Sequence, residues 1–589
     1  MNAMMQPNAP ENSYTLLLID ACLTLVAIAS VFAFPRLRCA PIRRIECFFS
    51  RLARRKTLAC ISVGASMLLL RLALLPLFPA PHPFLPDDFS FLLAADTFVH
   101  GRLANPAPAM WTHFESIHIT LQPTYMSMYF PATGLFLAAG KMLFGHPWAG
   151  ILIASSLMCG TLCWMLQAWL PPGWALLGGF IAVMRIGLFS YWTNTYTGGG
   201  SVSALGGALV LGAFPRLTRT GRLRYAILLG LGIALLSISR PYEGVLICVP
   251  VAAALGHWVL FGRNRPPALV LVRRAAAPLA IIGATLAWLG YYDYRAFGNP
   301  KTLPYAVDRA TYAIVPYYVW QKAHPTPQYR HSDLRAFYTE REARDFRLLH
   351  SRLGVVPYYG KKLSTTVFFL AGFLLLPPLV MFRRVFRDRR IRFFVCSLPF
   401  WVVGLGIGVY LIPHYLAPFT AAAYVFGVQA MRHLRAAKYR GAPVGRNLVT
   451  AMVVLCVVLT GLRAFSQPLG IAPGEWPINP WLGSWVGPGN FGMDRAKVVS
   501  QLEQIPGNHL VLVRYSPGHD TINEWVYNGA DIDGSRIIWA QDMDPAANAE
   551  LIQHYSDRDV WVVQPDVDHG KLAPYAYTSN LTSELAGKR

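Results

Sequence analysis

The sequence predicts a polytopic α-helical membrane protein of about twelve transmembrane helices, followed by a small C-terminal α/β domain. Apolar stretches of nearly 20 residues recur along the chain, and about 20 apolar residues are needed to cross the hydrocarbon core of a bilayer. Hydrophobic residues make up 54% of the chain, and the mean hydropathy is +0.36. Short basic loops separate the apolar stretches, as expected for a chain that crosses a membrane repeatedly.

The net charge of +23 arises from these loops and does not indicate a nucleic-acid partner. Five short loops together contain 27 Lys and Arg residues against only Glu46 and Asp388, and their excess is larger than that of the whole chain. Because Lys and Arg accumulate in short cytoplasmic loops, the basic residues predict topology. The five loops are 35–57, 215–224, 263–274, 383–392 and 432–446.

Counting the crossings between basic loops predicts that both chain termini are extracytoplasmic. A first span at 16–34 runs inward and a second at 58–77 returns to the outer face. An odd number of crossings must follow before the basic residues near 216, but four apolar helices are found there. We predict that the weakest of them, 124–144, lies in the outer interface, because Pro131 and Gly134 interrupt it. The other predicted spans are 148–170, 172–190, 198–214, 225–239, 243–262, 273–291, 364–382, 393–411, 415–431 and 447–464.

The chain then divides into three predicted domains. An anchor helix and a basic loop occupy 1–57, and a transmembrane domain occupies 58–464, with long outer loops at 78–147 and 292–362. Residues 465–589 are acidic overall, lack a spanning run and are predicted to form an extracytoplasmic α/β domain. Its predicted strands are 509–514, 536–540 and 559–563, and its predicted helices are 494–505 and 545–556.

An acidic pair, Asp87 and Asp88, follows the second apolar run at the outer membrane surface. Two neighbouring carboxylates cost free energy to keep ionised unless a metal, another cation or a proton is shared between them, so such pairs are common at functional sites. Capping of the helix that follows would explain one of the two. The pair alone leaves both interpretations open.

The predicted topology places three further polar turns on the same face, at 191–200, 240–243 and 413–415. Arg240 could bind a phosphate or extend along the membrane surface, and His414 with Tyr415 could contact a leaving group or belong to an aromatic belt. Glu115, close to His113 and His118, could contribute to a metal site or lie in a solvated loop. The candidate substrate-binding residues are Glu115, Arg240, Tyr242, Glu243, His414 and Tyr415.

The order of motifs in the first outer loop adds a family likeness. It runs Asp87-Asp88, His100-Gly101-Arg102-Leu103, Phe114-Glu115, Tyr129-Phe130-Pro131, an interfacial helix, and Phe144-Gly145-His146-Pro147. This order resembles that of GT-C glycosyltransferases, in particular the protein O-mannosyltransferase and lipid A aminoarabinose transferase branch. The resemblance covers roughly residues 58 to 260. It departs from the family at Asp88, where members commonly have Glu, and at Ala132, where they have a second proline.

The resemblance implies a GT-C-like enzyme of the cell envelope, in the bacterial inner membrane. Such a hexosyl- or pentosyltransferase moves a sugar with inversion from a polyprenyl-phosphate donor to a glycan, lipid or protein acceptor on the outer face. It implies Asp87 as the general base, with Asp88 orienting it or binding a divalent cation, and the two aspartates could exchange roles. Cations would stabilise the departing lipid phosphate.

Two other classes of function are consistent with the composition. A membrane transporter or lipid flippase would place ionisable residues within its spans and often shows inverted repeats. Here Arg71 and Arg185 stand out in the spans, and no acidic partner is near either of them in the sequence. An assembly protein would instead use the C-terminal domain to bind a partner.

Overall fold

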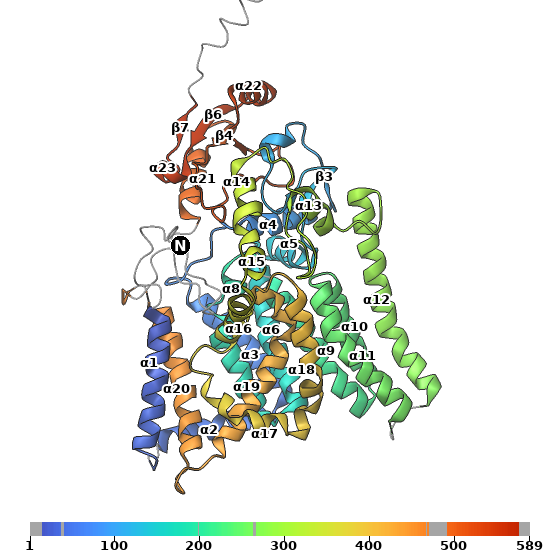
Figure 1. Cartoon of the computed structure of the whole chain (residues 1–589), viewed down its shortest axis with the longest axis vertical. Coiled ribbons are helices and arrows are strands. Elements are labelled where there is room, and N and C mark those ends of the chain that lie inside the picture. The colour runs from blue at the N-terminus through green and yellow to red at the C-terminus, as the bar shows by residue number, and fades with distance from the viewer. Residues whose placement is uncertain are drawn as a thin grey trace, which may run out of the picture.

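The computed structural model describes residues 15–36, 40–197, 199–262, 267–466, 468–470 and 492–575. Both chain termini and residues 471–491 of the predicted tail domain lie outside these ranges. The prediction that both termini are extracytoplasmic therefore concerns residues outside the described ranges. Long helices form an elongated bundle, and a smaller unit that contains a β-sheet lies at one end of it (Figure 1). We call residues 492–575 the C-terminal unit.

The bundle contains helices that are long enough to cross a membrane. Within the described ranges, seven helical segments have the length and the apolar composition of a membrane span. They are α3 (Lys56–Ala73), α6 (Trp148–Trp169), α9 (Gly199–Thr220), α11 (Pro241–Phe261), α12 (Ala268–Phe297), 389–407 with α18 (Arg392–Ile407), and α20 (Val444–Ala464). Shorter apolar helices are found in α1 (Thr15–Ala33), α5 (Ala132–Phe144), α7 (Pro172–Ala182) with η3 (Val183–Gly187), and α10 (Leu223–Ser237). The chain is therefore a polytopic helical membrane protein.

The predicted helix 124–144 is wrong in its first third. Residues Thr124–Ser127 form strand β3, which pairs antiparallel with β1 (Asn105–Pro106) and β2 (Ile119–Thr120). The helix α5 begins only at Ala132, directly after Pro131. Pairing with two other strands, β1 about 20 residues earlier and β2 in the same loop, decides the conformation of 124–127, and the hydropathy of the segment does not record that pairing.

The predicted span 364–382 is also interrupted. Helix α16 (Val355–Leu370) begins earlier and ends before Gly372, whose φ of +61° is in the left-handed region, and the 3₁₀ turn η5 (Pro377–Met381) follows. The predicted span 415–431 begins at α19 (Thr420–Arg435), after two further 3₁₀ turns, η7 (Pro413–Tyr415) and η8 (Ala417–Phe419). Proline and left-handed glycine end or delay helices at these points.

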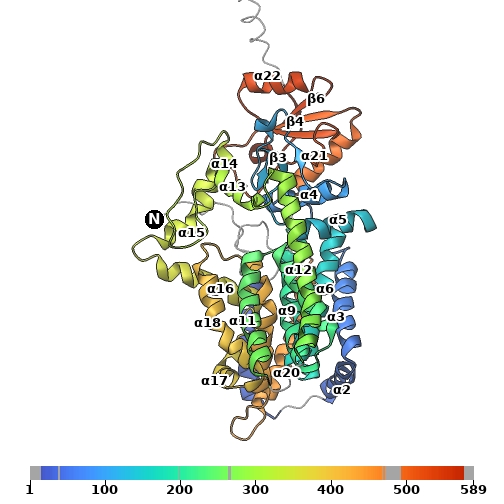
Figure 2. The same cartoon turned by 90° about the vertical axis from the view of Figure 1, so that its right-hand side faces the viewer.

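The helices of the two loops that were predicted to be outer loops lie at the same end of the bundle as the C-terminal unit (Figure 2). Helix α4 (Pro86–Val99) carries the acidic pair in its first turn. The second long outer loop contains α13 (Pro304–Tyr312), α14 (Ser332–Ala336), η4 (Phe337–Arg341) and α15 (Ala343–Leu349). At the other end of the bundle, the basic loop contains α2 (Ala40–Arg54), which lies across the foot of the bundle and was not predicted (Figure 1).

The C-terminal unit is an α/β fold. Its strands are β4 (His509–Val513), β5 (Ile537–Gln541), β6 (Asp559–Val563) and β7 (Ala573–Pro574), in the order β5-β4-β6-β7. The first three are parallel to one another, and β7 is antiparallel to β6. Helices α21 (Met493–Gln504), α22 (Pro545–His554) and α23 (Pro565–Asp568) accompany them. Strand β4 is central and fully buried, which explains its continuous apolar sequence.

The C-terminal unit and the first outer loop share one hydrophobic core. Leu93 of α4 and Phe114, from the 3₁₀ turn η2 (Trp111–Phe114), pack in one cluster with Leu510 and Leu512 of β4 and Ile538 of β5. A core built from both segments fixes their relative position, because separating them would expose these apolar side chains to water.

A charge within the predicted spans has a partner that the sequence did not indicate. Arg185 of η3 lies 3.9 Å from Asp20 of α1, and both side chains are buried. Arg71 of α3 donates to the carbonyls of Phe78 and Pro79 at 2.7 and 3.0 Å and to the side chain of Asn194 at 2.9 Å. Arg185 therefore connects η3 to α1, and Arg71 connects α3 to the chain that follows it and to Asn194.

Candidate active site

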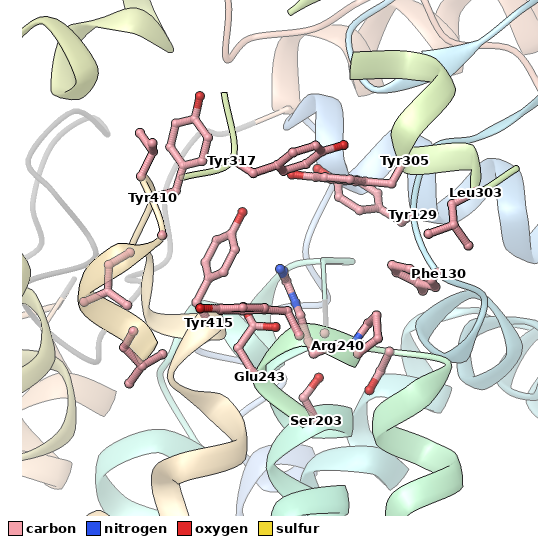
Figure 3. A pocket seen from close by; sticks show the side chains of 18 of the residues that line it. Tyr129, Phe130, Ser203, Arg240, Glu243, Leu303, Tyr305, Tyr317, Tyr410 and Tyr415 are labelled. Atoms are coloured by element: carbon pink, nitrogen blue, oxygen red, sulfur yellow. The ribbon is translucent and has the colours of Figure 1, made fainter. Parts of the chain in front are cut away.

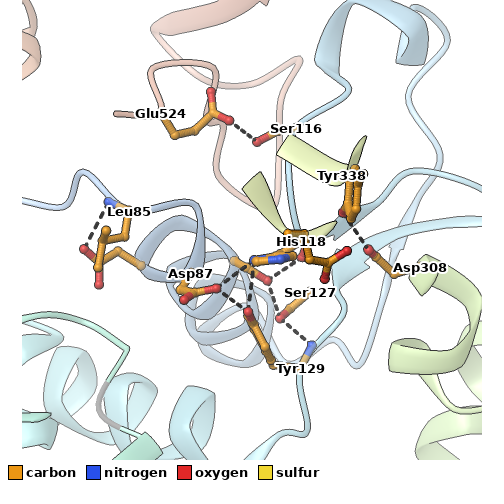
Figure 4. Close-up of polar contacts among 12 residues, drawn as sticks. Leu85, Asp87, Ser116, His118, Ser127, Tyr129, Asp308, Tyr338 and Glu524 are labelled. Atoms are coloured by element: carbon orange, nitrogen blue, oxygen red, sulfur yellow. Dashed lines mark hydrogen bonds and ion pairs between the residues drawn. The ribbon is translucent and has the colours of Figure 1, made fainter. Parts of the chain in front are cut away.

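Asp87 forms a compact polar group with two residues of the first outer loop (Figure 4). The Nδ1 atom of His118 lies 2.7 Å from its Oδ1, and the hydroxyl of Tyr129 donates to the same oxygen. The hydroxyl of Tyr129 is also 3.0 Å from Nδ1 of His118. The Asp87 side chain is 27% exposed and that of His118 only 13%, so one face of the carboxylate remains accessible. Its place in the first turn of α4 favours the ionised form.

The protonation states of Asp87 and His118 reinforce one another. Burial by itself raises the pKa of Asp87, but the charge of His118 and the hydrogen bonds from His118 and Tyr129 outweigh burial and lower that pKa to about 2. Burial by itself lowers the pKa of His118, and the charge of Asp87 and the hydrogen bond to it outweigh burial and raise it. The site thus pairs an ionised carboxylate with a histidine that favours its protonated form.

Asp88 has a different environment, although it is the next residue. Its Oδ1 accepts the backbone N–H of Tyr196 at 2.8 Å, and its Oδ2 faces the N–H groups of Phe84 and Leu85 at 3.4 Å each. The residue is fully buried, and burial raises its pKa to about 7 against the effect of these hydrogen bonds. Asp88 therefore links the start of α4 to the segment around Tyr196.

The two carboxylates do not form a joint cation site, because Asp87 faces side chains and Asp88 faces backbone N–H groups. In the part of the chain that the structure describes, no group of three or more His, Cys, Asp or Glu side chains is placed to hold a metal ion. The donor set around the pair does not fit a divalent cation, which needs several oxygen ligands directed at one point.

A cavity of about 430 Å³ lies beside this group (Figure 3). Seven tyrosines line it, including Tyr129, Tyr305, Tyr317 and Tyr410, which come from both outer loops and from the segment after α18. Arg240 points into the cavity, and its guanidinium carbon is 4.3 Å from the centre of the Tyr415 ring. Among the described residues that line the cavity, Arg240 is the cation, and the carboxyl group of Glu243 interacts with it electrostatically. Aromatic walls around a cation suit a ligand with an anionic group and a flat or apolar body.

Four of the candidate residues line the cavity, namely Arg240, Tyr242, Glu243 and Tyr415. His414 lies directly behind Tyr415, with the two rings stacked at 5.0 Å, and the Tyr191 hydroxyl is 2.9 Å from its Nδ1. Burial and the charge of Arg240 lower the pKa of His414 well below its usual value, so this imidazole is neutral.

Asp87 reaches the cavity through Tyr129. The ring of Tyr129 lines the cavity, while its hydroxyl contacts the carboxylate of Asp87. Glu115 lies elsewhere. It is buried, accepts the hydroxyl of Tyr312 at 2.9 Å, and lies 3.4 Å from His331. The structure therefore brings Asp87 and the cavity residues together and places Glu115 in a separate contact between the two outer loops.

Two residues of the site were not found by sequence reasoning. His118 was considered only as a neighbour of Glu115 in the sequence, and Tyr129 only as part of a motif. The available signal was the density of histidines and tyrosines in the outer loops, which does not distinguish an interface belt from a site.

No protein-family model matches the sequence, and no curated protein sequence matches it. Two of the similar solved structures are those of ArnT from Cupriavidus metallidurans and of the oligosaccharyltransferase AglB from Archaeoglobus fulgidus. The ArnT structure, bound to undecaprenyl phosphate, has a TM-score of 0.46 at 12% identity, covering 90% of this chain and 94% of that one. The AglB structure, in complex with an inhibitory peptide and a dolichol-phosphate, has a TM-score of 0.43 at 11% identity, covering 85% of this chain and 69% of that one.

Proposed function

We propose that this protein is a membrane glycosyltransferase that moves a sugar, with inversion, from a polyprenyl-phosphate donor to an acceptor on the extracytoplasmic face. The observation that carries the proposal is an accessible, ionised carboxylate, Asp87, which is joined through Tyr129 to an aromatic cavity that contains Arg240. The cavity supplies the cation for a phosphate, and the carboxylate supplies the acceptor for a proton.

In the proposed reaction the acceptor hydroxyl or amine attacks the anomeric carbon while its proton passes to Asp87. The bond between that carbon and the phosphate oxygen breaks, and the electron pair leaves with the lipid phosphate beside Arg240. A carboxylate with a pKa of about 2 does not deprotonate a free alcohol. Proton transfer therefore accompanies bond formation, when the attacking oxygen has become acidic.

The two aspartates have separate roles in this proposal. Asp87 is the base, because its carboxylate is partly exposed and held only by side chains. Asp88 is a positioning residue, because its oxygens are occupied by backbone N–H groups. This division follows from the direction in which each carboxylate faces, which the sequence alone left open.

The proposal includes an orientation of the protein in the membrane, which we infer from the position of the arginine-rich helix α2. Helix α4, which carries Asp87, and the C-terminal unit lie on the end of the bundle opposite α2 and its arginines (Figure 1). Because arginine-rich short loops remain in the cytoplasm, we place the cavity on the outer side of a membrane such as the bacterial inner membrane.

The direct test is a transfer assay with the purified protein in liposomes. The donors are a panel of undecaprenyl-phosphate sugars that carry a radioactive label, and cell-envelope extract supplies the acceptor. The expected result is loss of label from the lipid, with one or a few sugars preferred, and release of undecaprenyl phosphate. If no sugar in the panel is transferred to cell-envelope extract or to water, while undecaprenyl phosphate crosses the bilayer faster than in protein-free liposomes, a flippase is the correct assignment.

The raised pKa of His118 predicts a pH-dependent contribution to stability. A histidine whose pKa is raised on folding stabilises the protein fully below its ordinary pKa of 6.5, and this stabilisation is lost as the pH rises through the raised value. The melting temperature of the wild type should exceed that of His118→Gln by about 1–2 °C near about pH 6, because the pair is half-buried, and by less near about pH 9. Differential scanning fluorimetry in detergent measures the difference, and a gap that widens with pH contradicts the assignment.

A further inference from the structure

Glu524, a residue of the C-terminal unit, contacts both chain segments that carry the Asp87–His118 pair. Its backbone N–H donates to the carbonyl of Phe84 at 3.0 Å, shortly before Asp87 in the chain. Its carboxylate accepts the hydroxyl of Ser116 at 3.0 Å, shortly before His118 (Figure 4). One residue is thus connected to each partner of the pair by a separate hydrogen bond.

The carboxylate of Glu524 is itself held firmly. It is 3% exposed, and its Oε1 accepts the Tyr515 hydroxyl at 2.8 Å and the backbone N–H groups of Trp525 and Val526 at 2.9 and 2.8 Å. A buried carboxylate is costly to retain unless its lone pairs are satisfied. Here hydrogen bonds reach both oxygens, so the group is a fixed point to which Ser116 is attached.

Ser116 begins the tight turn that presents His118. The N–H of Ile119 faces the carbonyl of Ser116 at 3.4 Å across the turn, and His118 has a φ of +64°. This left-handed conformation costs a residue with a β-carbon on the order of 1 kcal/mol, so the surrounding contacts must maintain it. The carbonyl of His118 accepts from the Ser90 hydroxyl at 2.7 Å, which holds the far side of the turn.

Other residues of the same segment continue the contact along α4. Tyr527 stacks on Phe89 with ring centres 4.7 Å apart, and the N–H of Ala530 donates to Asp96 at 2.8 Å. The carbonyl of Asn528 accepts the hydroxyl of Tyr125, in the strand after the turn, at 2.7 Å. We call residues 524–530 the brace, because they run beside α4 from the residue before its first turn to its last turns.

We propose that the brace sets the geometry of the Asp87–His118 pair and that Glu524 is a positioning residue for it, acting through Ser116. The C-terminal unit is then part of the active site, although none of its residues lines the cavity. The consequence for catalysis rests on the proposed glycosyltransferase function, whereas the effect on the turn does not. A displacement of about 1 Å at a reacting group can cost about 100-fold in rate, so loss of one fixed point is expected to be measurable.

Hydrogen–deuterium exchange on the full-length protein in nanodiscs tests the positioning directly. Ser116→Ala removes one hydroxyl, and Glu524→Ala removes its partner. The matched control is Arg341→Ala, which breaks the exposed ion pair with Asp520 (2.9 Å) that also joins an outer loop to the C-terminal unit. We expect faster exchange of the amides of 113–121 in Ser116→Ala and Glu524→Ala, and exchange like the wild type in Arg341→Ala. Unchanged exchange in Ser116→Ala overturns the proposal even if Glu524→Ala fails to fold.

The kinetic measurement separates positioning from general stability. With an active donor, Ser116→Ala should lower kcat about tenfold and leave KM nearly unchanged, and Glu524→Gln should retain more activity than Glu524→Ala. Equal losses in Arg341→Ala and Ser116→Ala would overturn the proposal. If the wild type transfers no sugar, the glycosyltransferase proposal fails, and the exchange measurement still decides whether the brace holds the turn.

Discussion

Replacement of Asp87 by Asn should reduce sugar transfer about 1,000-fold, within the range expected for loss of a general base. The amide has nearly the same shape as the carboxylate but cannot take up the acceptor proton. Its oxygen can still accept from both His118 and Tyr129, because both of these contacts are made to the same atom of Asp87, Oδ1. Initial rates in liposomes, at saturating donor and acceptor, measure the effect as a loss in kcat. A variant that retains more than about a tenth of the wild-type rate would exclude Asp87 as the base.

The matched control is Asp88→Asn, the same substitution at the next residue of the same helix. Asp88 accepts three backbone N–H groups, and an amide must turn its own NH₂ toward at least one of them. We therefore expect Asp88→Asn to lower the melting temperature more than Asp87→Asn and to lower kcat less. If Asp88→Asn melts like the wild type but is inactive, while Asp87→Asn is active, the two roles are exchanged.

The helices and strands that could be predicted are those whose conformation depends on one property of their own sequence. Length and apolar composition identify the spanning helices, since the bilayer imposes both, and continuous apolar runs identify the parallel strands β4 and β6. The predictions failed at 124–131 and at 371–376. In the first segment pairing with two other strands overrides hydropathy, and in the second a glycine in the left-handed region ends the helix.

The site could be predicted only in outline. The position of the basic loops was enough to place Asp87, Arg240 and His414 on one face of the protein, and the structure brings all three to the region of one cavity. The pairing of Asp87 with His118 joins residues 31 apart in the sequence, and the contact between Ser116 and Glu524 joins residues 408 apart. Sequence periodicity describes neighbours within one element, so contacts between loops of different origin leave no periodic signal. The role of the brace therefore became visible only in the folded chain.

Replacement of Arg240 by Ala should weaken binding of the lipid phosphate and slow its departure. A charge-assisted hydrogen bond contributes about 1.5–3 kcal/mol, so we expect the Kd for undecaprenyl phosphate to rise about tenfold to 100-fold. Native mass spectrometry or quenching of tryptophan fluorescence measures this binding without a turnover assay. Arg240→Lys should restore only part of the affinity, because a lysine keeps the charge but loses the planar contact with Tyr415.

The control for Arg240→Ala is Lys361→Ala, which removes a cation from the same face that is already paired with Asp345 in an exposed ion pair. In the part of the chain that the structure describes, Arg309 and Lys362 are two other cations near the cavity, and both form hydrogen bonds within the protein. Arg309 is bound to Glu342 at 2.6 Å, and Lys362 donates to the carbonyls of Gly406 and Gly408 that end α18. A phosphate could recruit either one only by breaking these bonds, which would leave a buried carboxylate or two carbonyls unpaired. If Arg240→Ala binds undecaprenyl phosphate like the wild type, Arg240 is not the phosphate ligand, and loss of binding in Arg309→Gln or in Lys362→Gln would identify the cation that binds it.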